Sequence, residues 1–210
     1  MKITKFGHSC LLVEEGEARI LIDPGAYSTI PDLKNIDAIL ITHEHSDHYT
    51  VDILQNILKH NPEAIIYTNS GVGEFLQKAG IPFKTLLHGQ VAKVKGVSVE
   101  GVGEKHAYIY STLPICDNVG YLIAGRLLQP GDTLEPPQKA VEILAIPAAA
   151  PWAKLAETID YGKAVHAKIA FPIHDGFLGE KNPYNKHLER ELGTVGTKWI
   201  TLKTGEEIEV

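Results

Sequence analysis

The sequence has few cysteines, no long apolar run and no block of like charge. Its 210 residues include only 2 cysteines, Cys10 and Cys116, which are too few for a disulfide framework and suit small buried positions in a reducing compartment. No apolar run reaches the roughly 18 residues of a membrane-spanning helix, and no apolar signal core precedes the first strand-like residues. These features predict a cytoplasmic protein with no membrane partner.

The charges are mixed along the chain. The 20 basic and 26 acidic residues give a net charge of -6, and no cluster of Lys and Arg forms the basic stripe that binds nucleic acid or anionic lipid. This pattern argues against nucleic acid as a partner and favours a small-molecule substrate. A homo-oligomer stays open.

Hydrophobic periodicity predicts two similar halves. Each half begins with strands and turns and then alternates strands with helices. In the first half we expect strands at 3–6, 9–13, 18–22, 38–41 and 64–67 and helices at 51–59 and 72–79. In the second half we expect strands between 91 and 129, at 141–146 and at 168–173, helices at 152–166 and 187–192, and a closing hairpin of 199–202 with 207–210.

Nothing in the sequence marks a domain boundary. It contains no low-complexity segment and no linker, and 44% of its residues are hydrophobic, so we expect a single domain spanning residues 1–210. Strands that alternate with helices in both halves predict an α/β protein in which two mixed sheets pack together with helices outside.

A dense cluster of metal-ligand side chains follows the strand expected at 38–41. Four donors, His43, His45, Asp47 and His48, lie within six residues. Residues two apart in an extended segment face the same side, so His43 and His45 can converge. Zinc accepts imidazole and carboxylate ligands, and manganese or iron tolerates them. Four such close donors cannot bind one ion without strain, so we predict two adjacent ions. A solvated polar loop is the alternative, disfavoured because only 10 of 210 residues are His.

Further polar residues stand where other expected strands end. Loops at one sheet edge can bring such residues together. His106, Asp132 and His174 stand at such strand ends and are candidate ligands, with His88 as a competing loop histidine. Asp23 either orients a ligand imidazole or belongs to a plain Asp-Pro-Gly turn.

For four other residues the sequence leaves two locations open, the site and the hydrophobic core. His8 either faces the site or is a satisfied core histidine. Tyr108, Tyr110 and Trp152 are expected in the core rather than in a pocket, as is usual for aromatic residues.

The pattern His43-x-His45-x-Asp47-His48 resembles the signature of the metallo-β-lactamase superfamily. The match runs from Gly7-His8-Ser9 to Pro172-Ile173-His174. The resemblance implies a four-layer αββα sandwich of two mixed β-sheets and a centre of two divalent metal ions. It assigns the first ion to His43, His45 and His106, the second to Asp47, His48 and His174, and a bridging role to Asp132.

Within the superfamily, one branch is the nearest match. Gly7-His8-Ser9 followed by Asp23-Pro24-Gly25 looks most like the branch that includes ascorbate-6-phosphate lactonase and N-acyl-phosphatidylethanolamine phospholipase D. The family's Gly-rich segment before the penultimate helix is replaced here by residues 147–152, Pro-Ala-Ala-Ala-Pro-Trp. This departure bears on the substrate.

The expected activity is metal-dependent hydrolysis. Two close divalent ions can activate water, so we expect a metal-bound hydroxide to attack an ester, lactone or phosphodiester of a small molecule. Asp47 or Asp132 would carry the proton, and no Gly-x-Ser-x-Gly elbow supplies a nucleophile. The alternatives are a nuclease and a non-catalytic metal-dependent ligand-binding protein. A diiron redox role would need a flavin domain or partner.

Overall fold

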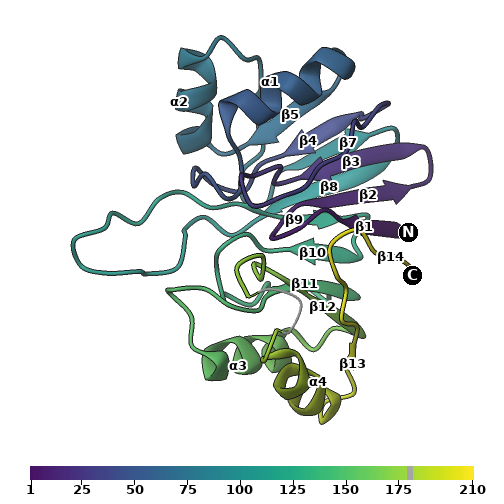
Figure 1. The fold of residues 1–210 in the computed structure, drawn as a ribbon, viewed down its shortest axis with the longest axis vertical. Helices are drawn as coiled ribbons and strands as arrows, with labels where there is room; N and C mark the ends of the chain where they lie inside the picture. The colour runs from purple at the N-terminus through teal and green to yellow at the C-terminus, as the bar shows by residue number, and fades with distance from the viewer. Residues whose placement is uncertain (179–181) are drawn as a thin grey trace.

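The computed structural model describes residues 1–178 and 182–210 and has four layers. Two mixed seven-stranded sheets lie face to face. Helices α1 (Val51–His60) and α2 (Ser70–Lys78) cover the outer face of one sheet, and α3 (Leu155–Val165) and α4 (Asn185–Gly193) cover the other (Figure 1). The αββα sandwich expected from the sequence is confirmed.

The first sheet combines antiparallel and parallel strands. It contains β1 (Lys2–Lys5), β2 (Leu11–Glu15), β3 (Ala18–Ile22), β4 (Ala38–Leu40), β5 (Ile65–Thr68), β6 (Lys84–Thr85) and β14 (Glu207–Glu209). The spatial order is β14-β1-β2-β3-β4-β5-β6. The strands from β14 to β3 pair antiparallel, whereas those from β3 to β6 pair parallel, with α1 and α2 as crossovers.

The second sheet repeats this plan. It contains β7 (Val91–Val94), β8 (Val97–Val102), β9 (Gly120–Ile123), β10 (Leu127–Gln129), β11 (Ile143–Pro147), β12 (Ile169–Ile173) and β13 (Lys198–Trp199). Its order is β13-β12-β11-β10-β9-β8-β7. Antiparallel pairing from β7 to β10 again gives way to parallel pairing from β10 to β13. The expected likeness of the two halves is present.

The expected closing hairpin is wrong. β13 pairs with β12 in the second sheet, whereas β14 crosses to the first sheet and pairs antiparallel with β1, opposing Ile208 to Ile3. The pairing places the last strand on an otherwise open sheet edge, where unpaired backbone groups are a liability. A local turn around Gly205 gave no indication of this long-range partner.

Three apolar layers hold the elements together. Alternate residues of β4 face opposite sides, so Ala38 and Leu40 pack between the sheets while Ile39 packs against the α1 and α2 side. A third cluster joins the second sheet to α3 and α4. The fully buried Tyr121 of β9 donates its hydroxyl to the carbonyl of Ile41 at 2.9 Å. This bond fixes the second sheet against the segment that leads into the histidine motif.

Candidate metal centre

The histidine motif begins where β4 ends, between the two sheets. The loops after β4, β8, β10 and β12 converge there, because the parallel strands of both sheets end on the same side. They bring together all seven residues expected from the sequence to be ligands. Potential ligand atoms fall into two groups, each within 4.8 Å: His43, His45, His106 and Asp132 in one, and His8, Asp47, His48 and His174 in the other.

Three of these imidazoles present a lone pair to the centre. The Nδ1 of His106 donates to the carbonyl of Ala107 at 2.6 Å, and the Nδ1 of His174 donates to the carbonyl of Ala149 at 2.6 Å. The Nδ1 of His48 lies 2.8 Å from a carboxylate oxygen of Asp23. With the proton on Nδ1, each Nε2 is an acceptor, and all three Nε2 atoms are buried without a hydrogen-bond partner among the described residues.

His43 and His45 complete the first group. Thr42 donates its hydroxyl to Asp23 at 2.9 Å, so the Thr42 oxygen accepts from Nδ1 of His43, 3.0 Å away. The Nε2 of His43 then faces Nδ1 of His45 at 3.1 Å. Side-by-side ring nitrogens of this kind suit a shared cation between them.

Asp132 lies between the two groups. Its Oδ2 is 3.3 Å from Nε2 of His106 in the first group and 2.9 Å from Nε2 of His174 in the second. Its Oδ1 is 3.1 Å from Nε2 of His48. The side chain is almost wholly buried, and such a carboxylate requires positive charge around it. The geometry is that expected for a bridging ligand.

The ionisation of the centre favours a cation. Burial lowers the pKa of His174, but Asp132 and Asp47 outweigh burial and raise it to about 9. Burial likewise lowers the pKa of His48, and Asp132 and Asp23 raise it well above its usual value. Burial raises the pKa of Asp132, whereas the imidazoles of His48 and His174 bring it well below the usual range. Without a metal ion these carboxylates would hold a second proton on Nε2 of each imidazole. That is the position a metal ion would take when the ring carries its proton on Nδ1 alone.

Asp23 holds the motif from behind. Its Oδ1 accepts from the backbone N–H of Thr42 at 2.8 Å, and its Oδ2 accepts from His48 and from Nε2 of Gln129, each at 2.8 Å. The side chain is fully buried. Of the two interpretations of Asp-Pro-Gly, the geometry supports the one in which Asp23 orients a ligand imidazole.

His8 supports Asp47. The backbone N–H of Gly176 donates to Nδ1 of His8 at 3.2 Å, and an amide N–H can only donate, so the His8 proton is on Nε2. That Nε2 lies 3.2 Å from Oδ2 of Asp47 and donates to it. Burial lowers the pKa of His8, which keeps the ring neutral. Although His8 lies among the second group, its geometry is that of a residue orienting Asp47.

Three residues of the centre have a strained backbone. His8, Asp23 and His174 have positive φ angles of 37°, 45° and 57°, in a region that non-glycine residues rarely adopt. Such strain is typical of functional sites. At His174 it turns the imidazole back from the end of β12 toward the centre.

The sequence is similar to those of known proteins. A family model described as "Beta-lactamase superfamily domain" matches residues 2–174. The protein belongs to the β-lactamase superfamily. Protein Rv0786c of Mycobacterium tuberculosis is 40% identical to it over 85% of each chain. The UPF0173 metal-dependent hydrolase NEQ378 of Nanoarchaeum equitans is 28% identical over 100% of each chain.

A solved structure agrees with the fold. Igni18, described as a novel metallo hydrolase of Ignicoccus hospitalis, superposes with a TM-score of 0.77 at 22% identity, covering 99% of this chain and 97% of that chain. The match to the family model confirms the superfamily expected from the histidine motif. The narrower branch that includes ascorbate-6-phosphate lactonase stays a prediction.

One contact in this superfamily member, between Trp152 and Asp132, could not be predicted from the sequence. The indole N–H of Trp152 donates to Oδ2 of Asp132 at 3.0 Å, and the ring lies between His106 and His174 at centroid distances of 5.7 and 5.9 Å. Trp152 is half-buried rather than in the core, because α3 starts at Leu155 and leaves it on the preceding loop. Only the segment Pro147 to Trp152, already noted as a departure from the family, pointed to this place.

The structure also places three other residues named from the sequence. Tyr108 and Tyr110 are exposed, so their assignment to the core is wrong. His88, the competitor of His106, belongs to neither group and accepts from the backbone N–H of Gly103. No helix among the described residues is long and apolar enough to cross a membrane.

The burial of one lysine, Lys5, was also not predicted from the sequence. Lys5 of β1 donates to the carboxylate of Asp175 at 2.6 Å and to the carbonyls of Pro172 and Leu202. The ion pair anchors the loop that follows His174. An isolated Lys in an alternating strand gives no indication that it is buried.

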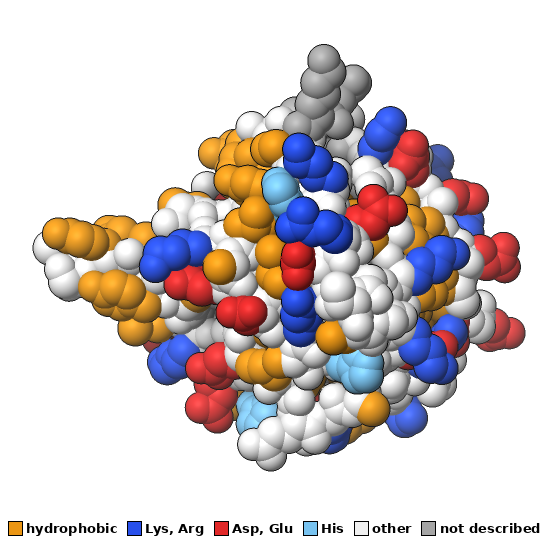
Figure 2. Space-filling model, turned by 90° about the horizontal axis from the view of Figure 1, so that it is seen from below, with side chains coloured by type: hydrophobic (Ala, Val, Ile, Leu, Met, Phe, Trp, Pro, Cys, Tyr) orange, Lys and Arg blue, Asp and Glu red, His pale blue; other side chains and the backbone are white. Residues whose placement is uncertain are grey.

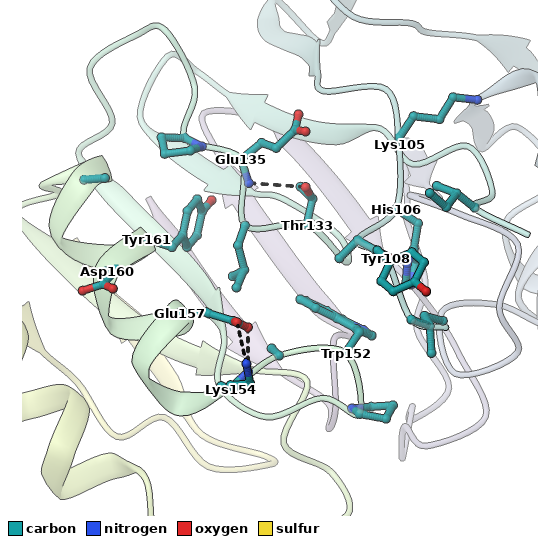
Figure 3. A pocket seen from close by; sticks show the side chains of 18 residues that line it. Lys105, His106, Tyr108, Thr133, Glu135, Trp152, Lys154, Glu157, Asp160 and Tyr161 are labelled. Carbon is teal, nitrogen blue, oxygen red and sulfur yellow. Dashed lines mark hydrogen bonds and ion pairs between the residues drawn. The ribbon is translucent and has the colours of Figure 1, made fainter. Parts of the chain in front are cut away.

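A cavity of about 1140 Å³ adjoins the centre. Figure 3 shows His106 and Tyr108 on one side of it and Tyr161 and Asp160 on the other, with Trp152 between. Because His106 and Trp152 contact both the cavity and the ligand cluster, a molecule in the cavity would lie next to the centre.

Proposed function

We propose that the protein is a hydrolase that depends on two divalent metal ions. His43, His45 and His106 would hold the first ion, Asp47, His48 and His174 the second, and Asp132 would contact both. One observation carries the proposal: the Nε2 atoms of His48, His106 and His174 are buried, unpartnered and aimed at Asp132, while each Nδ1 is fixed by an oxygen acceptor. In an ordinary core, buried ring nitrogens of this kind have hydrogen-bond partners, so three buried Nε2 atoms without a partner indicate a ligand site.

The donor set fits zinc, and manganese or iron stays possible. Neutral imidazole nitrogens and carboxylates are the ligands that zinc takes at catalytic sites. A pair of such ions lowers the pKa of water toward neutrality and stabilises the oxygen that gains charge in the transition state. The names of relatives described as metal-dependent or metallo hydrolases support the same chemistry.

The two carboxylates suit different roles. The Asp132 side chain is 2% exposed and receives the Trp152 N–H, so it is held in place and shielded from solvent. The Asp47 side chain is 21% exposed and receives the His8 N–H. Asp47 is therefore the carboxylate better placed to pass a proton between the substrate and solvent, and His8 would fix its orientation.

The expected substrate is a small ester, lactone or phosphodiester. A nuclease needs a basic track for the phosphate backbone. The two described lysines that line the cavity are each paired, Lys105 with Asp117 and Lys154 with Glu157. The geometry therefore favours a small-molecule substrate over RNA or DNA, and hydrolysis over mere binding rests on the two-metal arrangement.

Turnover by matched variants tests the proposal. The zinc-loaded protein is assayed with chromogenic esters, lactones and phosphodiesters and with labelled RNA. We expect hydrolysis of at least one small substrate, its loss in His45→Ala and Asp132→Ala, and its retention in the control His88→Ala, which removes a loop histidine outside the centre. Tight binding without turnover of any substrate would favour the non-catalytic alternative, and cleavage of RNA alone would favour the nuclease.

A further inference from the structure

The wall of the cavity beside the centre is mainly uncharged. Three loops and helix α3 form it: the loop between β8 and β9, the loop after β10, and the loop that precedes α3. Its apolar and aromatic members include Tyr108, Ile109, Ile115, Leu134, Pro151 and Trp152. Its two lysines each pair with a neighbouring carboxylate, and Glu135 and Asp160 add negative charge. A phosphate group entering this cavity would find no unpaired cation among the described lining residues.

One wall projects from the body of the molecule. We call residues 107–116 the finger. It contains no charged residue, and Figure 1 shows the β8–β9 loop extending away from both sheets. In Figure 2 hydrophobic side chains gather on the projection. Tyr108 is 58% exposed and Ile115 is 49% exposed, and both line the cavity.

When a ligand covers exposed apolar side chains beside the cavity, the removal of their surface from water lowers the free energy of the complex. Side chains of the finger that line the cavity face Trp152 across it, so a chain or ring placed between them would be desolvated on both sides. The indole N–H is already bonded to Asp132. Trp152 therefore offers the ligand the apolar surface of its ring, without a free donor.

We propose that this cavity binds the uncharged, apolar part of the substrate, an aryl or medium-chain acyl group, and discriminates against substituents bearing phosphate. The inference rests on the proposed function for the identity of the adjacent centre and adds the substrate class. Ile115 and Trp152 are then specificity residues, since their contacts depend on the length of the apolar group.

Intrinsic fluorescence can report this binding directly. The chain has 2 tryptophans, Trp152 and Trp199. Trp199 is buried and its N–H has no hydrogen-bond partner among the described residues, so Trp199→Phe removes no such bond. In this variant the only indole lies in the cavity wall. It is titrated with butanamide, hexanamide and octanamide, and separately with glucose 6-phosphate.

We expect affinity to rise by about fourfold for each methylene, the equivalent of about 0.8 kcal/mol per buried CH2. Glucose 6-phosphate should leave the emission unchanged at the concentrations at which octanamide saturates. An affinity independent of chain length, or preferred binding of the sugar phosphate, would overturn the inference.

Two finger variants locate the binding. Ile115→Asp, added to the single-tryptophan protein, should lower octanamide affinity at least tenfold. Leu113 is equally exposed at 49% and is not among the residues that line the cavity, so Leu113→Asp should change affinity less than twofold. Equal loss in both variants would place the amide on the finger surface and contradict the proposal.

Failure of this inference is separable from failure of the proposed function. Suppose that the protein binds zinc and hydrolyses short and long esters alike, and that fluorescence shows no effect of chain length. The proposed hydrolase function would then stand, and the proposed apolar specificity would be wrong. If binding depends on chain length but the protein retains no metal, the apolar site would stand and the proposed hydrolase function would be wrong.

Discussion

Nδ1 of His48 lies 2.8 Å from Oδ2 of Asp23 in a contact where both side chains are fully buried. The same Asp23 oxygen accepts from Thr42 and Gln129. This relationship sets the tautomer of His48 and keeps its Nε2 lone pair directed at Asp132. The orientation of the motif thus depends on a residue 25 positions earlier in the chain.

Replacing Asp23 by Asn tests this dependence. An amide NH2 cannot accept the hydrogen bonds that converge on Oδ2, so His48 should turn or change tautomer. We expect metal affinity to fall about 10- to 100-fold, the usual effect of losing such a support, as measured by competition with a chromophoric chelator. Asp37→Asn at the opposite end of β4 is the control and should bind metal normally. Unchanged affinity in Asp23→Asn would contradict the assignment.

His8→Ala distinguishes a supporting residue from a ligand. Because His8 donates to Asp47 and carries its proton on the nitrogen that faces the site, its loss should weaken metal binding without removing a site. We expect two ions per chain by native mass spectrometry, with about 10- to 100-fold lower affinity. His48→Ala should bind one. A single ion in His8→Ala would show that His8 is itself a ligand.

Gly25 allows the histidine loop to approach. A Cβ at this position would overlap the carbonyl oxygen of Asp47, so Gly25→Ala must displace the motif. We expect a loss of about 1–3 kcal/mol in the free energy of unfolding, as for overpacking elsewhere, together with weaker metal binding. Gly193→Ala, with nothing near its Cβ, is the control for chemical denaturation and should not destabilise. Normal metal binding in Gly25→Ala would argue against this close approach.

Lys5→Met tests the buried anchor beneath His174. Burial lowers the pKa of Lys5 while Asp175 opposes the shift, and removing the lysine leaves Asp175 and two carbonyls without their donor. Breaking such a pair costs about 3–5 kcal/mol, measurable by urea unfolding. Lys2→Met on the same strand removes an exposed lysine and should change stability little. Equal effects of the two substitutions would refute a special role for Lys5.

The sequence was most informative where chemistry and periodicity coincide. The apolar run of β4 that leads into His43 and His45 predicted a strand, and the spacing of the two histidines predicted convergent ligands. The repeated strand and helix pattern predicted two packed sheets with helices outside. Positions that depend on distant partners could not be read in this way. The register of β14 on β1, the burial of Lys5 and the contact of Trp152 with Asp132 each join segments more than 19 residues apart.

The roles of the ligand residues could likewise be predicted only where they do not depend on distant contacts. Residue type and position at strand ends, together with the resemblance to the superfamily, selected His106 over His88 and placed Asp132 with the motif. The role of His8 was left open because it depends on a tautomer, and the tautomer is set by the backbone of Gly176. Local sequence carries no information about that contact.

The most direct test of the account is the metal stoichiometry of the protein with its activity. Metal-free protein is titrated with zinc, and bound ions and hydrolysis are measured on the same samples. The account predicts two ions per chain, activity that requires them, and loss of both metal and activity in Asp132→Ala but not in His88→Ala. Protein that binds no metal, or that hydrolyses its substrate fully without it, would contradict the central claim.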